Sequence, residues 1–238
     1  MVNFRHYRSN LLLPVLAVLC TAASAYGQGT VSEELPVISS PREAARLIML
    51  RPTPDYPPVA KVNYLQGLVK VKITVTQQGK VTSAHVLEGN AILAVEALKA
   101  TRRWIYRPLV TVKGPSGFIT TVRLKFTLGN AAGELSPQRA EQDFLRQVRP
   151  PQTLVPSVAG PSQNVVRVRL LVNDEGQVVD RDCGPTSRPH FEATCESLQG
   201  WKFRPAFWGN LPIASYLDVN VPVDTPPLAR TASLTGSR

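Results

Sequence analysis

The length and composition of the chain exclude disorder throughout. It has 238 residues, of which 43% are hydrophobic, and this is enough for one large or two small folded units. Its 27 Lys and Arg residues against 17 Asp and Glu residues give a net charge of +10, which would ordinarily suggest nucleic acid or an acidic surface as partner. The first segment argues against nucleic acid, because it predicts export.

Residues 1–25 have the pattern of a cleaved signal peptide. Basic residues precede an apolar run from Leu11 to Leu19, and Ala23-Ser24-Ala25 supplies a small-x-small cleavage site. The run contains Pro14 and is shorter than the roughly 20 residues that span a bilayer. We therefore predict a periplasmic protein, with anchoring in the inner membrane as the alternative if the signal is retained.

A flexible segment, residues 26–39, is predicted to precede a first folded unit, residues 40–130. Residues 69–75 alternate strictly between apolar and polar, which is typical of a half-buried strand, and a turn containing Gly79 leads to a second strand at about residues 80–87. After Asn90, a candidate N-cap, Ala91, Val95 and Leu98 recur at helical spacing. The last predicted strand covers residues 118–128.

This pattern recurs 97 residues later. The strand at 69–75 reappears as residues 166–172, Gly79 as Gly176, and Trp104-Ile105-Tyr106-Arg107-Pro108 as Trp201-Lys202-Phe203-Arg204-Pro205. A second unit is therefore predicted at residues 136–224, followed by a flexible tail at 225–238. Each unit is predicted to be α+β, a small three-stranded antiparallel sheet with helices packed on one face.

Two cysteines, Cys183 and Cys195, remain once the signal is removed, and in an oxidising compartment this pair predicts a disulfide. Two unpaired core cysteines are the alternative. Metal binding is not predicted, because His85 and His190 do not lie at ligand spacing from the cysteines.

The first unit resembles the C-terminal domain of the TonB family. The resemblance covers residues 51–128 and rests on Pro54-Asp55-Tyr56-Pro57, then Gly67, the hairpin at 69–81 and the Trp104-x-Tyr106-x-Pro108 motif, which stand in the family's order. The second unit is similar but degenerate, since residues 152–156 lack the tyrosine and no glycine precedes its first strand.

The resemblance implies a protein that binds outer-membrane TonB-dependent receptors in energy-coupled transport, by pairing with a short receptor segment, the TonB box, at a sheet edge. We expect this binding edge in the last strand of the first unit, with the partner-binding residues Phe118, Thr120, Thr121, Val122, Arg123 and Lys125. We expect further contacts from the segment around Pro54, through Thr53 and Tyr56. Two alternatives stay open: Arg123 and Lys125 protect the edge against aggregation, and Tyr56 packs against its own domain.

The departures from the family also matter. Energy-transducing members carry an inner-membrane helix and a long Pro-rich linker, neither of which is evident here, and Thr53 stands where a glutamine is frequent. Inner-membrane motor proteins are therefore further candidate partners only for a tethered form. The alternative is a soluble periplasmic adaptor or envelope scaffold that binds other proteins without energy transduction.

Catalysis is not predicted. No serine, cysteine or histidine lies in a recognisable nucleophile motif, and neither a Gly-rich phosphate loop nor a paired-histidine metal motif occurs. We expect no catalytic residues, no cofactor and no small-molecule substrate.

Overall fold

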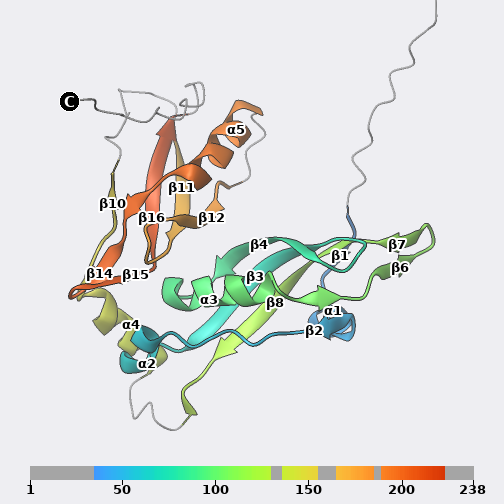
Figure 1. Cartoon of the computed structure of the whole chain (residues 1–238), viewed down its shortest axis with the longest axis horizontal. Coiled ribbons are helices and arrows are strands. Elements are labelled where there is room, and N and C mark those ends of the chain that lie inside the picture. The colour runs from blue at the N-terminus through green and yellow to red at the C-terminus, as the bar shows by residue number, and fades with distance from the viewer. Residues whose placement is uncertain (1–34, 130–135, 155–164, 185–188, 223–238) are drawn as a thin grey trace, which may run out of the picture. The chain divides into compact units, whose positions relative to one another are not determined.

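The computed structural model describes residues 35–129, 136–154, 165–184 and 189–222 (Figure 1). The predicted signal peptide (1–25) and tail (225–238) lie outside the described residues, as does most of the predicted flexible segment 26–39. Within the described ranges, no helix combines the length and apolar character that crossing a membrane requires.

Residues 35–129, the N-terminal half, contain a four-stranded sheet in the order β1-β8-β3-β4. The elements in chain order are β1 (Val37–Ile38), α1 (Pro41–Arg46), β2 (Ile48–Leu50), α2 (Pro58–Val62), β3 (Gly67–Val75), β4 (Val81–Glu88), α3 (Ala91–Thr101), β5 (Ile105–Tyr106), β6 (Leu109–Thr111), β7 (Gly114–Ser116) and β8 (Phe118–Phe126). Outside this sheet, β2 pairs with β5, and β6 pairs with β7 in a short hairpin.

The predicted hairpin forms one side of this sheet, with β3 inside the sheet and β4 at its edge. The alternation in β3 buries Val69, Val71, Ile73 and Val75 completely, and places the intervening polar residues on the opposite face. β3 pairs antiparallel with β4 on one side and with β8 on the other, so it is a central strand. We call the face that carries the polar residues of β3 the open face.

Helix α3 covers the other face of the sheet (Figure 1). Asn90 caps the helix as predicted, because its Oδ1 accepts the Ile92 N–H at 3.0 Å. The predicted inward residues are buried, but so is every other residue of α3 except Glu96 and Lys99. A helix buried nearly all round needs apolar contacts on both sides. Part of the second contact comes from the C-terminal half, whose Ile213 and Ala214 belong to the same core cluster.

The prediction of three strands for this sheet is incomplete, because β1 adds a fourth strand. β1 pairs in parallel with β8, Val37 opposite Ile119 and Ile38 opposite Thr120. Ile119 N–H donates to Pro36 O at 2.9 Å, and the Thr120 hydroxyl donates to Ile38 O at 2.8 Å. Residues 37 and 38, expected in the flexible segment, are therefore part of the sheet.

Residues 136–222, the C-terminal half, contain a three-stranded antiparallel sheet in the order β12-β11-β16. The elements are α4 (Pro137–Leu145), β9 (Val148–Arg149), β10 (Gln152–Thr153), β11 (Val165–Val172), β12 (Val178–Asp182), α5 (Pro189–Ser197), the short 3₁₀ helix η2 (Leu198–Gly200), β13 (Phe203–Arg204), β14 (Ala206–Trp208), β15 (Leu211–Ile213) and β16 (Ser215–Pro222). Phe191, Cys195 and Leu198, the predicted inward residues, are all buried. Leu198 lies in η2, immediately after the end of α5.

The predicted disulfide joins Cys183, just after β12, to Cys195 in α5. The two Cα atoms are 6.4 Å apart, within the usual range for a disulfide. The bond closes a short loop and ties helix α5 to the edge of the second sheet.

Both hairpin turns require glycine. Gly79 has φ +79°, and a Cβ built on it would lie 1.8 Å from the Tyr106 carbonyl oxygen. Gly176 has φ +78°, and a Cβ there would lie 1.9 Å from the carbonyl oxygen of Phe203. In each case the carbonyl of the glycine accepts the N–H of that same aromatic residue at 2.8 Å, so the chain passes close to the turn.

Candidate partner-binding site

The six edge residues predicted from the sequence all lie on β8, but they do not share one environment. Phe118 is fully buried, with its ring edge-on to Tyr106 at 5.5 Å between centroids, and Thr120 is 2% exposed. Thr121 and Val122 are half-buried, while Arg123 and Lys125 are exposed. Only the second half of the strand therefore offers side chains to a partner.

The backbone of β8 is divided in the same way. β1 covers β8 at Ile119 and Thr120 and then ends, because Ser40 caps helix α1 by accepting the Glu43 N–H and turns the chain away. Among the described residues, no strand pairs with residues 121–126 on the side away from β3. We call residues 121–126 the free half of β8.

Positive charge gathers on the open face beside this edge. The register places Lys70 of β3 next to Arg123, and Leu68 next to Lys125. Lys70 forms an ion pair with Glu88 on β4. Within the described ranges, neither Arg123 nor Lys125 has a carboxylate partner. Both cations therefore remain available to an acidic partner.

The segment around Pro54 is fixed to the domain by two aromatic residues. The Trp104 indole N–H donates to Pro52 O at 3.0 Å, and the Tyr56 hydroxyl donates to Leu65 O at 2.6 Å. Tyr56 is half-buried with its ring edge-on to Phe126 at 5.6 Å, so its side chain packs against the domain. Thr53, the other residue predicted here, is exposed.

The opposite edge of the sheet, β4, contacts the C-terminal half through a carboxylate that the sequence analysis missed. Asp180 of β12 accepts the Val86 N–H at 2.6 Å, and lies 2.9 Å from Nδ1 of His85. The Arg102 guanidinium donates to Val179 O at 3.0 Å. An edge-strand N–H that already has a carboxylate partner is no longer open to another strand. The pairing of β12 with β11 shifts register between Leu171 and Val172 and places Asp180 opposite Leu171, so alternation along β12 does not predict this contact.

The contacts of His85 extend to Ser83, whose Oγ lies 2.8 Å from Nε2. Serine, imidazole and carboxylate are thus linked in the order of a hydrolase triad. Ser83 and His85 lie two positions apart on β4, so their side chains share one face of the sheet. We interpret this hydrogen-bonded chain as structural.

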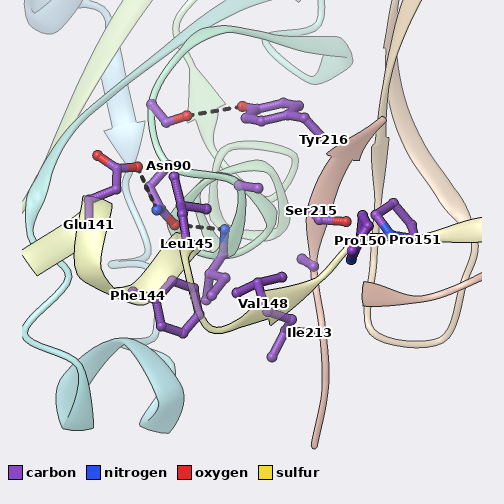
Figure 2. A pocket seen from close by; sticks show the side chains of 14 residues that line it. Asn90, Glu141, Phe144, Leu145, Val148, Pro150, Pro151, Ile213, Ser215 and Tyr216 are labelled. Atoms are coloured by element: carbon purple, nitrogen blue, oxygen red, sulfur yellow. Dashed lines mark hydrogen bonds between the residues drawn. The ribbon is translucent and has the colours of Figure 1, made fainter. Parts of the chain in front are cut away.

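A cavity of about 440 Å³ lies where α4, β16 and the start of α3 meet (Figure 2). Its lining is mostly apolar and includes Phe144, Val148 and Ile213. At its rim, Asn90 donates to Glu141 at 2.7 Å, and the Tyr216 hydroxyl donates to Gly89 O at 3.1 Å. These two hydrogen bonds join the N-terminal end of α3 to the C-terminal half.

Tyr216 is expected to make the stability of the protein depend on pH in the alkaline range. Burial, together with the nearby charge of Asp180, raises the pKa of Tyr216 to about 12. Because the folded state holds the phenol proton more tightly than the unfolded state, stability falls as the pH rises from about 10 to about 12. We expect Tyr216→Phe to remove this part of the pH dependence and to cost about 1 kcal/mol at pH 7 through the lost hydrogen bond. Urea unfolding of both proteins across this pH range measures the effect, and identical alkaline slopes would contradict it.

The comparisons with known proteins agree with the geometry of the N-terminal half. Residues 52–128 match the family described as Gram-negative bacterial TonB protein C-terminal. This span begins just before the Tyr56 segment and ends just after β8, and the match does not extend to the C-terminal half. A search of curated proteins finds no match to the chain. TonB C-terminal domains are protein-interaction domains of the bacterial cell envelope, and residues 52–128 of this chain are similar to them.

Proposed function

We propose that this protein binds outer-membrane TonB-dependent receptors by strand addition to the free half of β8, as a periplasmic TonB-like component of energy-coupled transport. The observation that carries the proposal is an unpaired strand edge inside a domain of the TonB C-terminal family. Backbone pairing of an added strand gives affinity without demanding particular side chains. The opposite edge is unsuited to this role, because the Val86 N–H is held by Asp180.

We further propose that the C-terminal half is a divergent second copy of the same domain. β12, β11 and β16 stand in the same order as β4, β3 and β8, and Val172 lies opposite Ser215 as Val75 lies opposite Phe118, each 97 residues later. Backbone hydrogen bonds also recur at this offset. Thr76 N–H donates to Lys80 O, as Asn173 N–H donates to Gln177 O. The same holds for Gly79 N–H to Thr76 O and Gly176 N–H to Asn173 O, and for Trp104 N–H to Thr101 O and Trp201 N–H to Leu198 O. An offset shared by strand register, turns and helix ends supports duplication.

The C-terminal copy is less suited to binding a strand. Its edge strand β16 ends in Pro222, which lacks an N–H, and the Arg169 guanidinium on β11 is paired with Asp218 of β16 at 2.9 Å. Tyr216, on the same strand, is engaged with the N-terminal half. We therefore assign receptor binding to the N-terminal half, and support of that half to the C-terminal one.

The test is an NMR titration of the full chain with TonB-box peptides from outer-membrane receptors of the same organism. We expect saturable amide shifts in residues 121–126, and smaller ones in β4. A matched peptide with alternate backbone amides N-methylated keeps its side chains but cannot donate the ladder hydrogen bonds, so it should not bind. Equal binding of the methylated peptide, or shifts confined to other elements, would exclude strand addition at β8.

A further inference from the structure

Strand β1 limits how much of β8 a partner strand can occupy. Ile38 is 7% exposed, and the Thr120 hydroxyl holds its carbonyl, so β1 is a packed part of the sheet. Helix α1, which follows β1 directly, also contacts β8. An added strand therefore meets β8 only beyond the end of β1, along the free half.

Within the free half, alternate residues direct their backbone groups outward. Ile119 N–H points away from β3, since it donates to Pro36 of β1. The backbone N–H and C=O groups of every second residue along a strand point the same way. After Ile119, these residues are Thr121, Arg123 and Lys125. An added strand would form its ladder hydrogen bonds with these three residues.

The side chains of the same residues select the partner's chemistry. Arg123 and Lys125 project from the open face and have no carboxylate partner among the described residues. Val122, Leu124 and Phe126 alternate with them and face the core side of the sheet. Every second side chain of a partner strand would therefore lie beside Arg123 and Lys125, and the intervening side chains would lie beside the apolar residues of β8.

We infer that the free half of β8 accepts a short extended segment in which carboxylates alternate with apolar residues, the carboxylates facing Arg123 and Lys125. The inference rests on the strand addition proposed above, but not on the identity of the receptor. Because β1 occupies the edge at Ile119 and Thr120, the binding site begins at Thr121. The amides of Ile119 and Thr120 therefore keep their existing partners when the segment binds.

The experiment uses synthetic peptides in which valine alternates with glutamate, lysine or glutamine. With the full chain, we expect the glutamate peptide to bind about tenfold more tightly than the glutamine peptide, and the lysine peptide most weakly. The double variant Arg123→Glu, Lys125→Glu should reverse the order, so that the lysine peptide binds best. The preference should weaken as salt is raised.

A matched control reverses the same charge elsewhere. Arg103 follows α3 and Arg139 lies on α4, so the double variant Arg103→Glu, Arg139→Glu should leave the order of the three peptides unchanged. If this control reverses the order as well, net charge and not the β8 edge selects the peptide, and the inference is overturned.

The outcomes separate this inference from the proposed function. If TonB-box peptides bind β8 but the three synthetic peptides bind equally well, the inference falls and the receptor function stands. If the glutamate peptide binds β8 but no TonB-box peptide does, the receptor function falls and the edge chemistry stands. Binding of neither class overturns both.

Discussion

Replacing Gly79 with alanine is expected to lower the free energy of unfolding by about 3 kcal/mol or more, because two costs combine. The positive φ of Gly79 is strained for any residue with a Cβ, and the Cβ itself would meet the Tyr106 carbonyl oxygen at 1.8 Å. Relief would require β5 to move away from the turn, which breaks the hydrogen bond from Tyr106 N–H to Gly79 O. Urea unfolding of the full chain measures the loss.

Two glycines provide controls for this substitution. Gly114 has φ +111° and open space around its Cβ position, so Gly114→Ala tests backbone strain without a clash. Gly200 has open space and no left-handed conformation, so Gly200→Ala should be nearly neutral. If Gly79→Ala costs no more than Gly114→Ala, the close approach of β5 is not a constraint.

Gly176→Ala should have a comparable cost in the C-terminal half, since its Cβ would lie 1.9 Å from Phe203 O. Hydrogen exchange would localise each loss, to β3, β4 and β5 for Gly79 and to β11, β12 and β13 for Gly176. Equal costs at the two positions are what a duplicated turn requires.

Replacing Trp104 with alanine is the second large effect, at about 3–5 kcal/mol. Trp104 is 2% exposed, its indole N–H is bonded to Pro52 O, and the Arg51 guanidinium lies 4.9 Å from its ring centroid. The substitution therefore leaves a large cavity and also frees the segment around Pro54. Loss of the Trp104 contacts should expose Tyr56, which is measurable as increased solvent accessibility of this tyrosine.

Trp201, 97 residues later, is the natural comparison. It packs at the margin of the second cluster and is only half-buried. Trp201→Ala should therefore cost clearly less than Trp104→Ala, at about 1–2 kcal/mol. Equal costs would show that burial does not set the contribution of this position.

The features that the sequence predicted well have a strong local period. The alternation in β3, the Gly-containing turn that follows it, and the spacing of Ala91, Val95 and Leu98 in α3 are each visible within a few positions of the sequence. The pairing of Cys183 with Cys195 followed from the predicted export and from the two cysteines that lie outside the predicted signal peptide. Local rules were sufficient for these features because the spacing of apolar residues distinguishes a strand from a helix.

Features that depend on distant contacts were missed. A strand of two residues, such as β1, has no period, and its partner on β8 lies 82 residues away. Tyr216 occupies a position in β16 that alternation alone assigns to solvent, and Asp180 is placed opposite Leu171 by a register shift in β12 that alternation does not predict. Their burial arises from contact with the N-terminal half, where each has a hydrogen-bond partner.

The pairing of β1 with β8 also constrains the order of folding. A chain made from its N-terminus presents residues 37 and 38 long before residues 119 and 120, so β1 waits as an unpaired segment while the hairpin and α3 form. Closing a loop of this length costs entropy that only the finished β8 can offset. β1 can therefore join the first sheet only once β8 is in place, and until it docks Ile119 and Thr120 lack this partner strand.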